Sequence, residues 1–487
     1  MLRARFPAAH SAGGSAIVHV MTFIDERAAV AARLPENASS PHLASELTET
    51  LKLAAPMALT QLGQIAMTTT DLAFIGRISD EAVAAVGLAG TVYFVSFTLG
   101  LGLMSAVAPL AAQAFGANNA PQVRRALRAG LWTALFISLP IMAFPLRGEW
   151  ILQALGQAAA TSHLAQQCLF GLAWGVMPAL WFHAIRSFMG AVNRPQPILW
   201  ITLAAIPANA LLAYLLIFGE FGLPRLGLFG AGLATTVVNF VMFLAGLWFC
   251  TQRKPFSKYR VLTRLWRIDW ALMRQIVIIG APISIAFLLE YGMFSSAGLL
   301  MGLIGTSALA AHQIALQITG ILFMLPYGIG MAATVRVGHA VGRNDATGVR
   351  RAGLIAMLLG VALSTILTLA VISTRVALAR FFLGGATPDA DATVGLAAML
   401  LVIGATLFVT DGLQATASGA LRGLKDTRVP LLFAAISYWL VGFSAAYALA
   451  FSTPLGASGV WIGLSLGTAV HATLLILRFL RLANRFG

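Results

Sequence analysis

The sequence predicts an all-α integral membrane protein with twelve transmembrane helices, arranged as two six-helix lobes related by a pseudo-two-fold axis along the membrane normal. Three observations predict this fold class. Hydrophobic residues make up 59% of the 487-residue chain and charged residues only 10%, whereas a soluble protein has about 25% charged residues. The apolar segments are long and continuous, without the alternation of a membrane β-barrel. The two halves of the chain also resemble each other.

Each of twelve apolar segments is long enough to cross a bilayer, since a transmembrane helix needs about 20 residues. Helices are favoured because every backbone polar group in lipid must find its partner within the protein. The predicted spans cover residues 48–75, 82–112, 126–147, 163–188, 197–219, 227–250, 273–300, 307–334, 352–374, 392–420, 429–451 and 457–482.

The segments outside the spans divide the chain. Residues 1–45 mix Ala, Arg, His, Pro and Ser without a sustained apolar run, which predicts a disordered cytoplasmic N-terminal tail, and Met21 offers an alternative start. The longest connection, 251–272, is predicted to be a cytoplasmic linker between an N-terminal lobe at 46–250 and a C-terminal lobe at 273–487.

Basic residues set the predicted orientation. The net charge of +15 comes mainly from Arg and Lys in the connections after even-numbered spans, and cytoplasmic loops gather such residues. Arg186 and Arg422 are counted among these loop residues. The bias places both termini and the 251–272 connection in the cytoplasm. Arg outnumbers Lys 28 to 4, which is typical of GC-rich bacterial genomes, so the expected location is the bacterial inner membrane. The positive charge therefore reflects membrane topology, so we expect the lipid bilayer as a partner and no nucleic acid.

An internal repeat relates the two halves at an offset of 226 residues. The segment LKLAAPMALTQLGQ from Leu51 resembles VIIGAPISIAFLLE from Val277, and Gly116 pairs with Gly342. Further on, MGAVNRPQP resembles RGLKDTRVP. Six spans per repeat preserve topology, so the axis runs along the membrane normal. Two parallel halves of this kind are typical of alternating-access transporters.

Three acids stand alone in apolar runs: Asp71, Glu290 and Asp411. An acid within hydrocarbon costs about 2.5–3.5 kcal/mol on insertion scales, and such residues are usually functional. At the repeat offset Glu290 aligns with Gln64, and Asp71 aligns with Ala297, so the two halves carry their acids at different places. The buried formal charges are predicted to be acidic, which indicates a path for cations.

The sequence favours a protein that is not an enzyme. It contains no Walker motif, HExxH, CxxC pair or serine-elbow motif, each of which would support specific catalytic chemistry. Cys168 and Cys250 lie in apolar runs, so neither a disulfide nor redox chemistry is expected.

Several motifs in order resemble the multidrug and toxic compound extrusion (MATE) family, nearest to its bacterial NorM-like branch. They are PISIAFLLEYGMF, AHQIALQ, LPYGIGMAATVRVGHAVG and TDGLQATASGALRGLKDTRVP, and the resemblance covers about residues 46–482. The resemblance implies a secondary active multidrug efflux antiporter that exchanges external Na+ or H+ for cytoplasmic organic cations. It implies cationic, amphipathic small molecules as substrates and no cofactor besides the coupling ion. We expect the chain to act as a monomer.

The resemblance also implies ion-coupling and substrate-binding positions. They correspond to Asp71 in TTTDLAFIGR, Asn209 in IPANALLAY, Glu290, and Asp411 in TDGLQ. No resident metal is implied, but Na+ would bind at Glu290 and Asp411 or at Asp71 and Asn209. Four residues after Asn209, where related proteins often carry Asp or Asn, this chain has Ala213. An N-lobe ion site would therefore have fewer ligands.

Structural roles for these residues remain alternatives. Glu290 could be bonded to a neighbouring helix, Asp411 could be partnered by Arg422 or Lys425, and Asp71 by Arg77. Asn209 could serve as polar contact between helices.

Two other functions remain open. A flippase for lipid-linked precursors should place basic residues in its cavity, which the acidic spans disfavour. A channel or membrane enzyme is disfavoured by the two-lobe repeat and the missing catalytic motifs.

Overall fold

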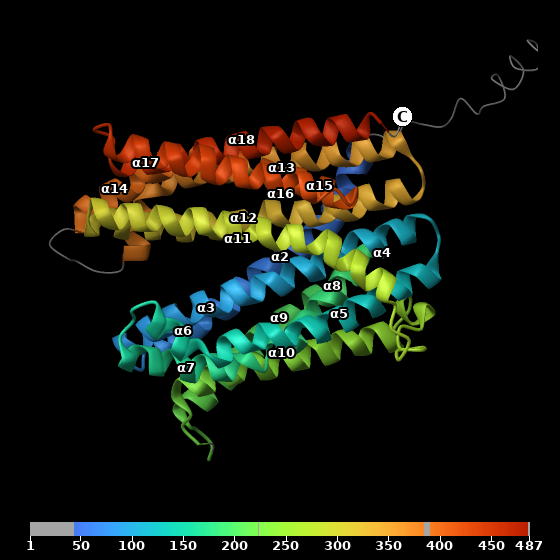
Figure 1. Cartoon of the computed structure of the whole chain (residues 1–487), viewed down its shortest axis with the longest axis horizontal. Helices are drawn as coiled ribbons and strands as arrows, with labels where there is room; N and C mark the ends of the chain where they lie inside the picture. The colour runs from blue at the N-terminus through green and yellow to red at the C-terminus, as the bar shows by residue number, and fades with distance from the viewer. Residues whose placement is uncertain (1–42, 223, 384–389, 486–487) are drawn as a thin grey trace, which may run out of the picture. The chain divides into compact units, whose positions relative to one another are not determined.

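The computed structural model describes residues 43–222, 224–383 and 390–485, and this part of the chain is almost entirely helical (Figure 1). The first half contains α2 (Leu43–Ile75), α3 (Asp80–Ser105), α4 (Val107–Gly116), α5 (Ala120–Leu146), α6 (Gly148–Ala154), α7 (Ala159–Ala173), α8 (Val176–Ala191), α9 (Gln196–Phe218) and α10 (Gly227–Gln252). The second half contains α11 (Trp270–Ile304), α12 (Thr306–Gly342), α13 (Ala346–Leu383), α14 (Ala390–Ile403), α15 (Ala405–Gly423), α16 (Arg428–Ala434), the π-helix η2 (Ala435–Phe443), α17 (Ser444–Phe451) and α18 (Ala457–Ala483). A 3-10 helix, η1 (Phe256–Tyr259), lies between the halves in sequence.

The predicted spans match these helices. In the described part of the chain, nine helical spans are long and apolar enough to cross a membrane, and two bent helix pairs bring the number to eleven. The 33-residue α2, which is more polar because it holds glutamines, threonines and Asp71, matches the remaining predicted span. The fold class is therefore confirmed. The predicted tail lies outside the described residues as far as residue 42, and α2 begins at Leu43, before the predicted end of that tail.

Both halves bend the corresponding span. The fourth span consists of α7 and α8, and the tenth consists of α14 and α15, each pair bent by 48° at a short break. Most other helices extend several residues beyond the predicted spans at the ends rich in basic residues. Arg186, which falls within the predicted span 163–188, lies inside α8, and Arg422 lies inside the longer α15. Neither is a loop residue, which corrects their predicted placement.

The hydrophobic core joins the two halves at one end only. One core cluster combines first-half residues with the start of α11, Leu272 to Ile283, and with Ile329 to Val335 of α12. Toward the other end, a second cluster contains only first-half residues, around Leu169 and Ala213. A third contains only second-half residues, around Leu400 and Trp461. The halves therefore share apolar packing near one end and pack separately toward the other.

The contacts at the shared end repeat with the internal symmetry. Gly116 of α4 lies so close to His339 of α12 that a methyl group there would overlap the backbone, and Gly342 has the same relation to Gln113. These two pairs are related by the offset of 226 residues. Only glycine permits backbones to approach this closely. We call this end of the molecule the joined end.

Hydrogen bonds between the halves reinforce the joined end. Gln113 donates through Nε2 to the Gly423 carbonyl at 2.8 Å, and His339 donates through Nε2 to the Ala191 carbonyl at 2.6 Å. Ser284 donates to the Leu99 carbonyl at 2.7 Å, and Arg336 of α12 bonds Thr50 of α2.

The segment predicted as the inter-lobe linker folds against the first half. Trp132 donates through Nε1 to the Leu265 carbonyl at 2.8 Å. Asp269 caps α11 by accepting from the Leu272 N–H at 3.2 Å, and it pairs with Arg125 at 2.6 Å. Burial works against ionisation of Asp269, but these hydrogen bonds outweigh it and hold the pKa of the carboxyl below its ordinary value of 3.8.

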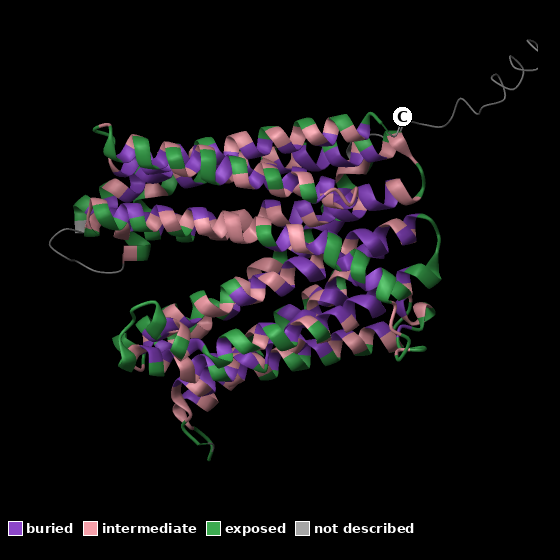
Figure 2. Cartoon of the chain, in the orientation of Figure 1, coloured by how far each residue is buried: buried purple, intermediate pink, exposed green. Residues whose placement is uncertain are grey.

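Large apolar side chains cover much of the outer surface. Figure 2 shows exposed and buried residues mixed along the same helices. Leu299, Leu303, Ile366, Leu369 and Leu440 are among the most exposed of the large apolar residues. Apolar exposure over whole helices would promote aggregation in water but suits contact with lipid tails.

Candidate ion-coupling site

In the first half, Asp71 is held by hydrogen bonds from two other helices. Asn209 of α9 donates through Nδ2 to Asp71 Oδ1 at 2.5 Å. Thr235 of α10 donates its hydroxyl to Asp71 Oδ2 at 3.2 Å. Asn209 is completely buried, and its Oδ1 has no partner. The predicted pair of Asp71 and Asn209 is therefore brought together, with both carboxylate oxygens occupied by protein donors.

Thr235 was not predicted from the sequence. Its hydroxyl also lies 3.3 Å from the Ala231 carbonyl one turn earlier, which is the usual partner for threonine within a helix. The neighbouring Thr236 bonds the Gly171 carbonyl instead. Sequence alone cannot distinguish these two threonines. Ala213, one turn beyond Asn209, is fully buried and adds no ligand.

In the second half, Glu290 lies against Gln414. Gln414 of α15 donates through Nε2 to Glu290 Oε1 at 3.2 Å, and its own Oε1 is buried without a partner. Gln414 follows Asp411 by three residues, so the two share a helix face. The spacing within TDGLQ could have identified Gln414 as a candidate, although it was not named.

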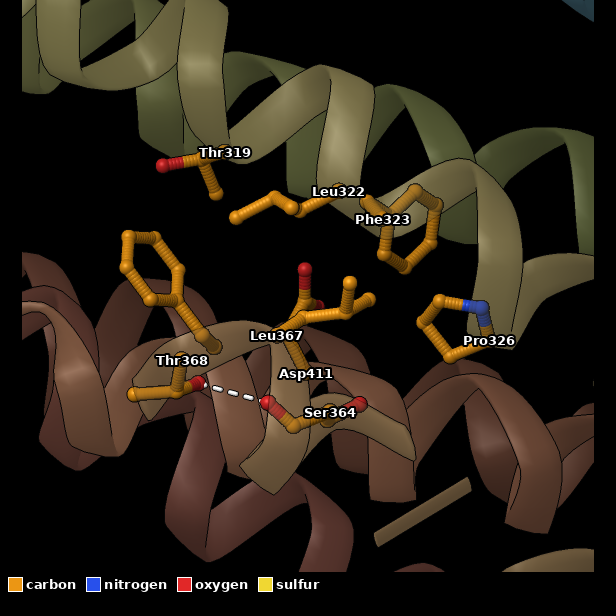
Figure 3. Close-up of a pocket in the computed structure, with 9 residues that line it drawn as sticks. Thr319, Leu322, Phe323, Pro326, Ser364, Leu367, Thr368 and Asp411 are labelled. Carbon is orange, nitrogen blue, oxygen red and sulfur yellow. Dashed lines mark hydrogen bonds between the residues drawn. The ribbon is translucent and has the colours of Figure 1, made fainter. Parts of the chain in front are cut away.

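Asp411 points into a small pocket between α12, α13 and α15. Figure 3 shows its carboxyl between Leu322 of α12 and Ser364 of α13. Asp411 is 5% exposed, and its Oδ1 lacks a hydrogen-bond partner. The buried hydroxyl of Ser364 also lacks one. The complete lining consists of Thr319, Leu322, Phe323, Pro326, Ser364, Leu367, Thr368, Phe408 and Asp411.

The second-half site therefore has more oxygen acceptors than donors. The charges of Glu290 and Asp411 are close enough to act on each other. Unpartnered oxygens lie on Asp411 and Gln414 of α15 and on Ser364 of the neighbouring α13. Two repelling carboxylates with free oxygens suit a proton or a hard cation such as Na+, because such cations prefer oxygen ligands.

A π-helix lies beside this site. Trp439 of η2 donates its indole N–H to the Leu289 carbonyl at 3.2 Å, next to Glu290. Tyr438 of η2 bonds His471 of α18 at 2.7 Å. π-Helical segments are frequent at functional sites because they displace the helix register locally. Here one side chain of the segment, Trp439, bonds the carbonyl next to Glu290.

The structure separates the acids from the basic partners considered as alternatives. Arg77 lies over the Phe74 ring at 5.9 Å, and Arg422 lies over the Phe287 ring at 4.9 Å. Within the described residues, neither arginine forms an ion pair with the three candidate acids. Glu290 does bond a neighbouring helix, but through an amide that leaves its charge uncompensated.

Arg186 corrects the prediction that buried formal charges are acidic. It is 7% exposed, Nη2 lies 3.2 Å from Met331 Sδ of the second half, and Nη1 has no partner. The sequence argument against a flippase is weaker for this reason. The case for cation binding therefore depends on the arrangement of the acid oxygens themselves.

These features define a class of protein. Two similar six-helix halves, joined at one end and holding acids within apolar helices, form the architecture of a secondary transporter. The model of the MatE family matches residues 56–215 and again residues 282–448. The two matches begin 226 residues apart, which is the offset of the internal repeat. The chain belongs to the MatE family, as the resemblance predicted, and is a transporter rather than an enzyme.

Curated relatives cover nearly the whole chain. "Probable multidrug resistance protein NorM" of Bradyrhizobium diazoefficiens is 65% identical over 452 residues, 93% of this chain and 96% of that protein. A protein of the same name in Rhodopseudomonas palustris is 54% identical over 468 residues, 96% of this chain and 98% of that protein. These relatives confirm the predicted NorM-like branch.

Solved structures share the fold. The eukaryotic MATE transporter AtDTX14 superimposes with a TM-score of 0.80 at 22% identity, covering 91% of this chain and 98% of that one. A multidrug resistance MATE family transporter described as outward-facing gives a TM-score of 0.82 at 19% identity, covering 91% and 96%. At these identities the likeness supports the fold alone.

Proposed function

We propose that this chain is a secondary active antiporter that exports amphipathic organic cations in exchange for Na+ or H+. The observation that carries the proposal is the excess of acceptor oxygens around Glu290, Gln414 and Asp411 in apolar helices. Family membership and the multidrug resistance names of the relatives support the same function.

The mechanism is competition for negative charge. Glu290 and Asp411 repel each other, so whichever cation binds between or beside them relieves that repulsion. A proton, Na+ or an organic cation can each do so. Binding of the ion from outside then expels the substrate. Coupling requires that ion and substrate favour different conformations, because a ligand with equal affinity for both states shifts nothing.

The conformational change opens the joined end. Basic residues cluster near this end, which favours a cytoplasmic position for it by the charge bias of membrane proteins. The structure would then be the outward-facing state. Opening toward the cytoplasm requires the glycine contacts at Gly116 and Gly342 to separate. The membrane potential favours inward cation movement by about 2.3 kcal/mol per charge per 100 mV.

The same orientation supports the predicted location. With the joined end inside, both termini lie in the cytoplasm of a bacterial inner membrane. Each half supplies its own acid ligands, so a single chain is sufficient, and we propose a monomer.

The first-half pair of Asp71 and Asn209 is proposed as a secondary cation site. Its single acid already accepts hydrogen bonds from Asn209 and Thr235. A proton or Na+ must displace at least one of these donors, so binding is weaker than in the second half.

The proposal is tested with purified protein in liposomes, using one gradient at a time. Dye export driven by Na+ alone or by H+ alone identifies the coupling ion. Glu290→Gln and Asp411→Asn should each abolish gradient-driven export, because each removes one negative charge from the competition. Asp80→Asn, an acid at a helix start, is the matched control and should export normally. Normal export by both site variants would refute the proposal.

A further inference from the structure

Arg422 lies in the last turn of α15, and its cationic side chain packs on an aromatic ring. Its side chain is half-buried, and its guanidinium carbon lies 4.9 Å from the centre of the Phe287 ring of α11. It forms no ion pair within the described residues. Asp426, one turn further on, is instead bonded by Arg478 at 2.7 Å. Arg422 is thus held on an aromatic face rather than on an acid.

Arg422 shares a helix face with the second-half site. Gln414, Ser418 and Arg422 follow one another at intervals of four residues along α15, which places them in one row. Long helical side chains lean toward the helix N-terminus, so the guanidinium leans toward Gln414. On the facing helix, Phe287 precedes Glu290 by three residues, a separation of about 4.5 Å along the axis. The ring that holds the cation therefore belongs to a residue about one helical turn from Glu290.

The charge of Arg422 already reaches this site. It acts electrostatically on Glu290 and on Tyr438 of η2. Glu290 in turn acts on Asp411. The acids thus have one counter-charge on the helix that carries Asp411, and it forms no ion pair with either of them.

Space is available beside Arg422. A small, partly open pocket lies between α11, α15 and α16 on the joined-end side of Glu290. Its polar lining comes from Ser418, Arg422, Asp426 and Thr427. The Arg422 side chain therefore borders a small opening in the packing on one side.

We propose that Arg422 is a tethered cation that takes the place of the coupling ion beside Glu290 after that ion has left. This proposal rests on the antiport function proposed above. An antiporter passes through a step in which substrate moves and no coupling ion is bound. In that step the organic cation neutralises one of the two carboxylates, and the other, left bare within an apolar bundle, is strongly unfavourable. Arg422 neutralises this second carboxylate, and a new coupling ion returns Arg422 to Phe287.

The test measures how well the coupling ion displaces a substrate. A fluorescent organic cation is bound to purified protein, and the concentration of Na+, or of H+ without Na+, that releases half of it is determined. Arg422→Gln removes the competing cation, so release should need about tenfold less ion. Phe287→Leu removes the aromatic ring that holds the guanidinium, so Arg422 should move toward Glu290 and compete more strongly with the ion. Release should then need about threefold more ion. Changes of opposite sign are not expected from a merely structural role.

Two variants control the experiment. Arg422→Lys keeps a tethered charge and should stay near the wild type. Arg428→Gln removes an exposed charge at the start of α16 and should cause no shift. An unchanged Arg422→Gln protein, shifts of the same sign in Arg422→Gln and Phe287→Leu, or an equal shift in Arg428→Gln would overturn the role of Arg422 while the antiport stands. Failure of both ions to release the dye from wild-type protein would instead remove the proposed antiport and this inference together.

Discussion

The two halves of the molecule share one scaffold but hold their acids differently. In the first half, both oxygens of Asp71 accept hydrogen bonds, from Asn209 and Thr235. In the second half, Glu290 has one amide donor, and Asp411 Oδ1 has no partner. Hydrogen bonds from the protein stabilise the first acid without a cation, whereas the second pair needs a cation to offset its repulsion. The repeat thus supplied a common frame, and the acids were placed on it independently.

The largest expected effect separates the two acid sites. Asp411→Asn should reduce ion-driven export to the background of empty liposomes, because Glu290 alone no longer offers two charges. Asp71→Asn should retain a measurable part of the export, because the second-half pair is intact. Initial rates of dye export in liposomes measure both. If Asp71→Asn lost all export and Asp411→Asn exported normally, the first-half acid would be the more important of the two.

The second-largest effect is expected at the joined end, where the two halves pack together through glycines. Gly116→Leu and Gly342→Leu should both prevent closure of the joined end, because their side chains would overlap the facing backbone. We expect both to lose export and to expose a cysteine placed at Ala191 to a water-soluble thiol reagent. Gly87→Leu is the matched control, since nothing lies within 4 Å of the added Cβ. Unequal behaviour of the two glycine variants would show that the joined end is not symmetric in function.

A smaller effect is expected from removing the side chains that donate hydrogen bonds to the acids. Gln414→Leu removes the amide next to Glu290 and should change the half-releasing ion concentration about tenfold, since hydrogen bonds to charged groups contribute about 1.5–3 kcal/mol. Thr235→Val removes a longer bond to Asp71, which keeps Asn209, and should change it about threefold at most. Dye release by the ion provides the readout. Equal effects of the two variants would remove the distinction between the sites.

The smallest effect is expected from Asp269, in the segment between the two halves. The pKa of Asp269 is held below its ordinary value of 3.8, so its stabilising contribution is complete above that value and is lost as the pH falls below it. Asp269→Asn should lower stability near neutral pH by at most about 1 kcal/mol and should remove this acid sensitivity. Thermal unfolding in detergent at pH 7 and at acid pH measures both. If Asp269→Asn loses as much stability at acid pH as the wild type does, another carboxyl is responsible for the acid sensitivity.

Several contacts could not be predicted from the sequence, because they join residues that are far apart along the chain. Thr235 reaches Asp71 across 164 residues, and Gln414 reaches Glu290 across 124. Threonine and glutamine are common in transmembrane helices as polar contacts, so only their position in space identifies these two. The burial of Arg186 was missed because this residue, although within the predicted span 163–188, was counted with the loop residues. The contact of Arg422 with Phe287 was missed because the span 392–420 was drawn too short at its basic end.

The sequence by itself determined that this protein is a twelve-span, two-lobe transporter and which three acids lie within it. Hydrophobicity and charge are properties of composition along the chain, and a constant repeat offset directly indicates duplicated lobes. Only the tertiary structure decided which end joins the halves, which acid is satisfied by protein donors and which pair is left with free oxygens. Those outcomes depend on distances of a few ångströms between residues far apart in sequence, since hydrogen bonding and electrostatic repulsion act only through such contacts.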